Sequence, residues 1–502
     1  MLPYQVEASI AEGQQRVQDL FTFVRKNAKD LEAHQAEKSV FKLLLPIGLA
    51  AMKAYFAERG TGDVGPTIVR EDGLVLDRQS KLGQRDYFSI FGKFDVPRTC
   101  YRASGTGEDG VFPLDEQVNL PERCYSYFLQ DWMTQFAVEQ PFRETGTIFD
   151  DFFDLLVAES VVLNVTLEAQ DDYDAFYEQK PPPPVGEEQI LAVSFDGKGV
   201  PLIKAEAAEL KAKLGSGEKR QKTKEALVGV CYTVDPKARS AEDLAEYLVR
   251  PERARERWKS EGTDGEQQPR AENVRRMASL INSKEEVMTC IKTDAERRDP
   301  DHKLRLALLL DGDLKLWSLV RWRFRAWKRT TRILDIIHVV GYLWLAANAL
   351  FPAESEEGKD WVQGKLTDLL EGRVGYVIGA LKLILAKRKL SGSKREALTD
   401  VIRYFTNHRR WMRYDKYLAA GLPISTGVVE SACGSLVKPR MEGSGRRWTS
   451  IGAEAVLVLR SLKKSHGNDL RQYWDFRAQE ERRRLYESER SWRPNAHLRA
   501  VA

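Results

Sequence analysis

The sequence predicts a mixed α+β fold, in which helices and strands occupy different parts of a long chain. Three observations lead to this class: a change from helical to strand-like spacing near Thr67, two highly apolar strand-like runs (ILAVSF and LALLL), and a long helical stretch from residue 352 onward. With 42% hydrophobic and 10% aromatic residues, the 502-residue chain cannot be wholly disordered, a collagen-like repeat or a coiled-coil rod. A prior of roughly 150 residues per domain allows about three domains.

The first third of the chain divides into helical, strand and helical parts. Residues 4–60 predict two helices, of which the second begins at SVFKLLLP and ends at Gly60. Short β-branched and aromatic runs from Thr67 to Arg102 predict a small antiparallel β module, ending in the Gly-rich loop SGTGEDG. The helical pattern resumes near Pro121 and stops at KPPPPV, a stiff polyproline spacer that is typical of a domain boundary.

After the spacer, strands and helices alternate. ILAVSFDGKGVPLIK predicts a strand, a Gly-flanked turn and a second strand, and ALVGVCYTV predicts a third. Residues 238–300 are charged and mostly helical in pattern, and KLRLALLLDGD then gives a strand apolar enough to be covered on both faces. LKLWSLVRWRF predicts a helix, RTTRILDII a fifth strand and HVVGYLWLAANALF a helix. Residues 352–420 read as helical, and residues 477–499 as an Arg/Glu-rich helix with a frayed end.

These patterns divide the chain into successive regions. In order, they are an N-terminal helical region (1–62), a small β module (63–120), a helical, helix-turn-helix-like region (121–180), a Pro-rich linker (181–186), the first part of an α/β domain (187–351), a helical insertion (352–420), the last part of the α/β domain (421–470) and a charged C-terminal tail (471–502).

Charge and cysteine content set limits on location and partners. The net charge of +4 neither predicts nor excludes a nucleic-acid partner, so local clusters must decide. The five cysteines are scattered and suggest no disulfide framework, which favours a reducing compartment. The N-terminus has no export-signal pattern, and the apolar stretch Ile336–Phe351 is shorter than the roughly 20 residues of a membrane span. We therefore expect a cytoplasmic protein with no membrane contact.

Two carboxylates follow apolar strands directly. Asp196 occurs in AVSFDGKG and Asp311 in LALLLDGD, each at the predicted carboxyl end of a strand, where open α/β sheets bind ligands. A single Asp-Gly pair is most often only a turn, but two of them on adjacent buried strands favour a site. Hard divalent cations need oxygen ligands, and a Mg²⁺ pair can activate a water or hydroxyl for attack on a phosphodiester.

A site of this kind needs a third carboxylate, and Glu430 in STGVVESACGSLV fits. Ser425 or Thr426 can begin a helix there, and Glu430 falls off its apolar stripe. The alternative is a carboxylate that only stabilises the helix N-terminus, by about 0.5 kcal/mol. Asp313 is an alternative to Asp311 as the second acid, because alternate residues of an extended strand share a face.

At these residues the chain closely resembles the DDE transposases of bacterial insertion sequences, specifically the ISKra-type family within the Mutator-like group. The N-terminal YFSIFGKFDVPRTCYR and EQPFRETGTIF resemble the family's β module and helix-turn-helix region. The motifs that carry the catalytic resemblance are FDGKG around Asp196, LLLDGDLKLW around Asp311, ILDIIHVVGYLW around His338, and GLPISTGVVESACGSLVKPRMEGSGRRWTSIGAEAVLVLRSL around Glu430.

The resemblance implies a ribonuclease-H-like α/β catalytic domain, interrupted by an all-helical insertion and preceded by a DNA-binding N-terminal region. It implies that Asp196, Asp311 and Glu430 are the catalytic, metal-binding residues and hold two Mg²⁺ or Mn²⁺ ions. The implied activity is DNA cleavage at the 3′ ends of an element, with water as nucleophile, and transfer of the freed 3′-hydroxyls to target DNA. The implied partners are the terminal inverted repeats, the target DNA and further copies of the chain, as a homodimer or higher oligomer on DNA near the nucleoid.

Asp335 and His338, in LDIIH, are secondary candidates for the active site. Related Mutator-like enzymes have a Cys-x-x-His pair at this place, and here Asp replaces Cys. A histidine at a strand-helix junction is more often structural than a phosphate contact. The loop RASGTGEDGV lacks the Cys pairs that many family members carry, so we expect no zinc site there.

Two basic clusters predict DNA contacts. The first, residues 321–332, interleaves aromatic residues with cations and could hold phosphates and stack on bases, although a solvated helix face is the alternative. The second follows Glu430, and some of its cations could instead offset the negative charge of the acids. The residues concerned are Arg321, Trp322, Arg323, Phe324, Arg325, Trp327, Lys328 and Arg329 in the first cluster, and Lys438, Arg440, Arg446, Arg447 and Trp448 in the second.

Two alternatives to a transposase stay open. A ribonuclease-H-like nuclease or resolvase would cleave DNA without joining it. A catalytically inactive, transposase-derived protein would still bind element ends. The complete set of acids, Asp196, Asp311 and Glu430, argues against the inactive alternative.

Overall fold

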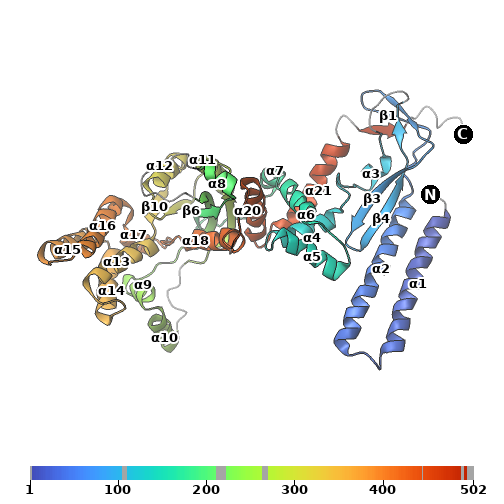
Figure 1. The fold of residues 1–502 in the computed structure, drawn as a ribbon. Coiled ribbons are helices and arrows are strands. Elements are labelled where there is room, and N and C mark those ends of the chain that lie inside the picture. Colours follow the sequence, from blue (N-terminus) through green and yellow to red (C-terminus); the bar gives the residue numbers. More distant parts are fainter. Residues whose placement is uncertain are drawn as a thin grey trace. The chain divides into compact units, whose positions relative to one another are not determined.

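The computed structural model describes residues 3–103, 110–210, 222–262, 269–443, 445–487 and 491–494. It confirms a mixed α+β fold, with a five-stranded mixed sheet that contains parallel pairs, and small antiparallel sheets (Figure 1). The chain divides into two compact units, residues 1–179 with 470–502, and residues 180–469. Most of the predicted Gly-rich loop SGTGEDG and the frayed C-terminal end lie outside the described residues.

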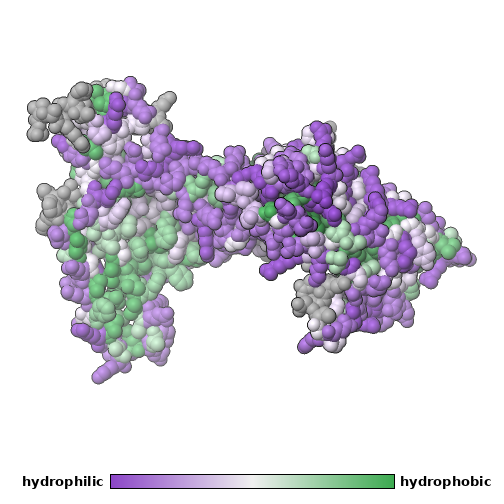
Figure 2. Space-filling view, turned by 180° about the vertical axis from the view of Figure 1, so that it is seen from behind, coloured by the Kyte–Doolittle hydropathy of each residue, from purple (hydrophilic) through white to green (hydrophobic). Residues whose placement is uncertain are grey.

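The first unit begins with two long helices, α1 (Pro3–Asn27) and α2 (Ala33–Arg59), which lie side by side and confirm the predicted pair (Figure 1). Helix α2 starts before SVFK and continues through Pro46. Several large apolar side chains of this pair are exposed, Phe21 at 60% and Leu44 at 46%, and Figure 2 shows the apolar surface they form. By length and composition alone α2 could cross a membrane, but core helices of other proteins pass the same test.

The predicted antiparallel β module is confirmed, but its sheets also include the end of the chain. A short strand after the last helix, β11 (Trp492–Pro494), pairs antiparallel with β1, so the prediction of one helix over residues 477–499 is wrong there. Short β-strands that pair with distant segments have little local periodicity, so the sequence pattern does not predict this one. The other strands are β1 (Thr67–Arg70), β2 (Val75–Arg78), β3 (Gly83–Ser89), β4 (Gly92–Arg98) and β5 (Tyr101–Arg102), followed by helix α3 (Pro113–Gln117).

Helices complete the first unit and confirm the helical prediction for the stretch after Pro121. The C-terminal helix α21 (Leu470–Tyr486) packs among them, since the Trp474 indole N–H donates to Thr134 Oγ1 at 3.0 Å. The buried ion pair of Arg477 with Asp172, at 2.6 Å, fixes the same helix. The remaining helices are α4 (Tyr127–Ala137), α5 (Phe142–Phe153), α6 (Glu159–Glu168) and α7 (Tyr173–Gln179).

The second unit is built on a five-stranded sheet of order β10-β9-β6-β7-β8. The central strand β6 runs antiparallel to β7, which runs antiparallel to β8, whereas β6, β9 and β10 are parallel. The apolar parts of the middle strands are buried, residues 190–195 of β6, 226–234 of β7 and 306–310 of β9, as their continuous apolar sequences predict. The strand bounds are β6 (Ile190–Pro201), β7 (Thr223–Val234), β8 (Glu272–Ser279), β9 (Arg305–Leu310) and β10 (Thr330–Leu334).

Two strand predictions in this unit are wrong. The glycines of FDGKG do not make a turn, because β6 continues through them and pairs with β7 from Ile190 to Pro201. Extended backbone is open to glycine, and the long β7 supplies a partner for every residue of the strand. Strand β8 falls in a region that was predicted to be helical. Its sequence, ENVRRMAS, lies at a sheet edge, and its charged residues obscure the alternation of apolar and polar residues by which a strand is recognised.

Helices cover the sheet and form a block beyond it. Helix α11 packs on β7 and β8, and α20 packs on β8. The helical prediction for residues 352–420 is confirmed, and this block packs against α13 through α14 and α16. The bounds are α8 (Lys204–Glu209), α9 (Ala241–Val249), α10 (Pro251–Glu261), α11 (Lys284–Arg298), α12 (Leu314–Arg323), α13 (Ile336–Leu350), α14 (Glu356–Leu370), α15 (Val374–Lys387), α16 (Gly392–His408), α17 (Tyr414–Ala419), α18 (Gly427–Ala432), α19 (Lys438–Met441) and α20 (Ser450–Lys464).

Candidate active site

Three aspartates lie at the carboxyl ends of the parallel strands. Asp311 directly follows β9, and Asp335 directly follows β10, where its backbone N–H donates to the Leu310 carbonyl at 2.9 Å. Asp196 lies within β6, two residues beyond Ser194, the last β6 residue to pair with β9. Because the carboxyl ends of parallel strands share one edge of the sheet, all three acids reach the same side of the unit.

Asp196 and Asp311 both accept hydrogen bonds from the backbone N–H of the glycine that follows them. The Asp196 carboxylate accepts hydrogen bonds from the Gly197 N–H at 2.7 Å and from Cys433 Sγ at 3.4 Å. Asp311 Oδ1 accepts from Gly312 N–H at 2.6 Å and from Asp313 N–H at 3.1 Å, which leaves its Oδ2 for another partner. Burial raises the pKa of Asp196, and the nearby negative charge of Asp311 raises it further.

Asp313 has a different role from Asp311. Its Oδ1 accepts hydrogen bonds from the Lys315 and Leu316 N–H groups, at 2.7 and 3.2 Å, and so begins helix α12 as an N-cap. Its side chain is exposed, whereas Asp311 is partly buried at the sheet edge. The geometry therefore favours Asp311 over Asp313 as the second acid.

In the described part of the chain, Asp335, His338 and Glu430 form a group of possible metal ligands, with one ligand atom from each lying within 4.8 Å of the others, and Asp196 and Asp311 are not in this group. Asp335 is fully buried and accepts from the Thr426 N–H at 2.7 Å, and from the backbone and ring nitrogens of His338 at 2.8 Å each. Thr426 Oγ1 donates to Glu430 Oε1 at 2.8 Å. Because both Asp335 oxygens are already bonded, Asp335 holds His338 and the Glu430 loop in position.

His338 is the one base among these three side chains. Its hydrogen bond with Asp335 raises the pKa of His338, and the charges of Asp311 and Glu430 act in the same direction. The ring bonds to Asp335 through Nδ1, which turns Nε2 toward the other acids. His338 can therefore offer a protonated nitrogen to a phosphate oxygen beside the acids.

We expect the His338 imidazole to titrate above the ordinary value of about 6.5, in an NMR titration of the ring protons. The pKa of His338 is higher in the folded than in the unfolded state. Its contribution to the free energy of unfolding is therefore fully present below the unfolded-state pKa and is lost as the pH rises through the folded-state pKa. Asp335→Asn removes the charge of the partner, so its His338 midpoint should fall toward 6.5. An unchanged midpoint in Asp335→Asn would show that Asp335 does not set the ionisation of His338.

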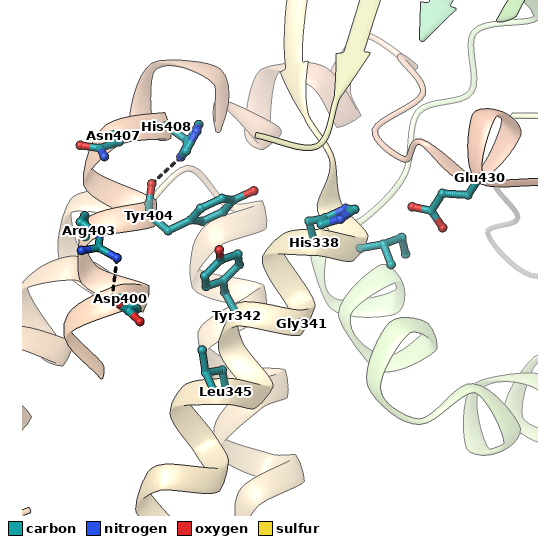
Figure 3. Close-up of a pocket in the computed structure, with 11 residues that line it drawn as sticks. His338, Gly341, Tyr342, Leu345, Asp400, Arg403, Tyr404, Asn407, His408 and Glu430 are labelled. Atoms are coloured by element: carbon teal, nitrogen blue, oxygen red, sulfur yellow. Dashed lines mark hydrogen bonds and ion pairs between the residues drawn. The ribbon is translucent and has the colours of Figure 1, made fainter. Parts of the chain in front are cut away.

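A cleft of about 620 Å³ opens beside these residues. His338 and Glu430 face it from α13 and α18, and Tyr342 and Tyr404 stack on each other at its wall with ring centroids 3.8 Å apart (Figure 3). The Tyr404 hydroxyl donates to the Asp311 carbonyl at 2.5 Å. His408 Nε2 lies 2.9 Å from the carbonyl of Gly312, so α16 supports the turn that carries Asp311.

Sequence reasoning missed several of the residues that build this site. Cys433 contacts Asp196 and comes three positions after Glu430, about one helical turn, a spacing that is visible in the sequence. Arg460 is 1% exposed and donates to the Leu436 carbonyl at 2.6 Å, which fixes the segment after Glu430. Tyr404 gave no sequence signal, because its role depends on where α16 packs.

The first basic cluster is divided between surface and core. Trp322 is 60% exposed, and the guanidinium groups of Arg323 and Arg325 lie 5.4 and 5.0 Å from its ring centroid. Phe324 and Trp327 are 2% and 3% exposed, so the prediction that they stack on DNA bases is wrong. Both follow the end of α12, where the Phe324 ring lies beside that of Phe195 and the Trp327 indole N–H donates to Asp299 at 3.2 Å. Arg321, Lys328 and Arg329 lie exposed on the surface.

The second basic cluster is partly structural. Arg440 is 2% exposed and lies over the ring of Trp448, 4.5 Å from its centroid, and Trp448 itself is 7% exposed, so the prediction that these two contact DNA is wrong. The Arg446 guanidinium is bound to the carbonyls of Pro439 and Arg440, at 3.0 Å each. Lys438 and Arg447 are exposed and available to an external anion.

The donor atoms of the site suit a hard divalent cation better than a soft one. Asp196, Asp311 and Glu430 offer carboxylate oxygens, the ligands that Mg²⁺ prefers. The thiol of Cys433 is not a competing ligand in its present state, because burial raises its pKa and keeps it protonated. No protein-family model matches this chain, and a search of curated proteins finds no match either. The chemistry of the site must therefore be inferred from its own residues.

Proposed function

We propose that the chain is a Mg²⁺-dependent DNA transposase of a bacterial insertion sequence, with a ribonuclease-H-like catalytic domain in the second unit. The sheet supports this fold. Its central strand β6 lies between an antiparallel pair, β7 and β8, and a parallel pair, β9 and β10, which is the order and direction expected of ribonuclease-H-like folds. The helices after β10 occupy the place of an insertion before the segment with Glu430.

The observation that carries the proposal is that acids from distant parts of the sequence come near one another. Asp196 and Asp311 lie at the ends of the paired parallel stretches of β6 and β9, and Glu430 lies in α18 beside His338. Asp196 and Asp311 lie close enough for the charge of one to raise the pKa of the other. The negative charges of Asp311 and Glu430 both raise the pKa of His338, which supports a site that these acids share. Like charges gathered in this way repel one another unless a cation offsets them.

The acids fit a pair of divalent cations. Asp196, Asp311 and Glu430 would hold them, with Mn²⁺ as a substitute for Mg²⁺. When bound, such ions lower the pKa of a water or hydroxyl nucleophile and stabilise the leaving oxygen of a phosphodiester. In this proposal Asp335 has a different role, because it is fully buried and accepts hydrogen bonds from the Thr426 N–H and from the ring and backbone of His338. It orients His338, which can hold a phosphate oxygen of the DNA.

The proposed reaction has two steps on DNA. Water attacks the phosphodiester at the 3′ end of the element, and the freed 3′-hydroxyl then attacks the target DNA. The protein partners are further copies of the chain, because two ends have to be joined, and the location that follows is the cytoplasm near the nucleoid. A nuclease without strand transfer uses the same acids, so the joining step distinguishes the two enzymes.

The test is a strand-transfer assay with DNA from the borders of the gene. Full-length protein is mixed with labelled duplexes that carry candidate inverted repeats, target plasmid and Mg²⁺. Cleaved ends joined to the plasmid are the expected result. Cleaved ends that are never joined would identify the nuclease, and specific binding without cleavage would identify the inactive DNA-binding protein.

A further inference from the structure

A second, strongly basic cleft lies in the same unit, outside the candidate active site. Its volume is about 610 Å³, and it is bordered by the amino ends of β9 and β10, by the turn 409–411 and by α17. We call it the basic groove. Its cations are Arg305, Arg329, Arg332, Arg410, Arg413 and Lys416.

These cations have no acidic partners within the described part of the chain. Arg305 and Arg329 donate only to backbone carbonyls, those of Ala420 at 3.3 Å and Lys303 at 3.0 Å. Burial lowers the pKa of Arg332, and repulsion from Arg321 and Arg410 lowers it further. The adjoining cleft that Arg410, Arg413 and Lys416 also line contains one acid, Asp415, so positive charge remains in excess. Mutual repulsion of the cations costs stability, which a polyanion would recover.

A further cleft, of about 850 Å³, connects this groove to the candidate active site. It shares Arg410, Arg413 and Lys416 with the basic groove. It shares Asn407 with the cleft that His338 and Glu430 face. The three clefts therefore adjoin one another through these shared residues, between Glu430 and the edge strand β10, within one compact unit.

We propose that the basic groove binds the phosphate backbone of duplex DNA, about five base pairs from the scissile phosphate. The proposal rests on the proposed function, because it takes the acids as the place of cleavage. Strand β10 separates the two sites: its five residues at about 3.3 Å each span roughly 16 Å. Duplex DNA advances about 3.4 Å per base pair, so this length corresponds to about five base pairs.

The surface of the groove fits a duplex better than a single strand. Single-strand sites stack bases on exposed aromatic rings. The rings in this groove, Trp411 and Tyr417, are 5% and 6% exposed, and the Tyr417 hydroxyl donates to the Arg332 carbonyl at 3.0 Å. Guanidinium and ammonium groups are what remains exposed, and these contact phosphates.

The test compares two triple variants that remove equal charge. The groove variant is Arg410→Gln, Arg413→Gln and Lys416→Gln, all at exposed side chains. The control variant is Lys387→Gln, Lys389→Gln and Lys394→Gln, exposed cations of the same unit outside the groove. Binding of full-length protein to a labelled 24-base-pair duplex is measured by fluorescence anisotropy in EDTA, over a series of salt concentrations.

We expect the groove variant to bind the duplex at least about tenfold more weakly at 0.1 M salt. The slope of the logarithm of the binding constant against the logarithm of the salt concentration should become shallower by about 2 to 3, because each phosphate contact contributes about 0.9 to it. The control variant should stay within twofold of wild type. The single change Arg413→Gln, which should lower the slope by about 1, gives the answer if the triple variant unfolds.

Equal binding by the groove and control variants would overturn the proposal. If the groove variant lost more affinity for a single-stranded DNA or RNA of equal charge than for the duplex, the choice of duplex DNA as the ligand would be overturned. Because binding is measured without Mg²⁺, these results do not depend on catalysis. If the wild-type protein bound the duplex through the groove but never cleaved DNA, the proposed function would be contradicted, whereas the proposal for the basic groove would still hold.

Discussion

Asp196→Asn, Asp311→Asn and Glu430→Gln should each lower the rate of DNA cleavage by about 10³-fold or more, with duplex binding within twofold of wild type. Each change keeps the shape of the side chain and removes its negative charge, so a divalent cation loses an anionic ligand while the fold keeps its packing. Cleavage of labelled element ends in Mg²⁺ measures the first effect, and anisotropy in EDTA measures the second.

Asp313→Asn is the matched control for Asp311→Asn. Asparagine caps helices about as well as aspartate, so α12 should keep its first turn and cleavage should stay within a few-fold of wild type. The two residues are neighbours at the same turn, so the comparison separates a metal ligand from a cap. Full cleavage by Asp311→Asn, together with loss in Asp313→Asn, would move the second acid to position 313.

The sequence predicts at which edge of the sheet Asp196 and Asp311 lie, but not exactly where each strand ends. Asp311 follows an apolar run that has to be buried, and that pattern depends only on local composition. Asp196 was placed at a strand end that does not exist, yet it still lies at the site, because the parallel partner β9 stops before it. A pairing partner in a distant part of the chain decides where a strand ends, and no local pattern contains it.

The same limit explains the errors around the DNA contacts. Trp327 and Trp448 stand in basic runs, and a run of cations does not reveal which aromatic ring points inward. Arg413 and Lys416 were not singled out, because they join Arg329 and Arg332 only after α17 packs beside β10. Clusters that form from separate segments need the tertiary structure, whereas motifs within one segment do not.

Asp335→Ala should destabilise the second unit by about 3 kcal/mol, because it removes a buried acceptor of several hydrogen bonds. The Thr426 N–H would be left without its partner in the interior, and this is a large part of the cost. Asp335→Asn keeps one carbonyl acceptor and should lose about half as much. Native-state hydrogen exchange at the Thr426 amide, followed by NMR or mass spectrometry, reports the loss at the bond itself.

His338→Ala is the control, since it removes the exposed partner of Asp335 and leaves the buried hydrogen bond of Thr426 in place. Its Thr426 amide should keep nearly wild-type protection, while Asp335→Ala exchanges faster by about 10²-fold, the equivalent of about 3 kcal/mol. Equal protection in both variants would mean that Asp335 acts only on the histidine. Faster exchange in Asp335→Ala alone would mean that the buried Asp335 carboxylate joins the end of β10 to the loop that carries Glu430. The geometry of the proposed metal-binding acids would then depend on a residue that is not one of them.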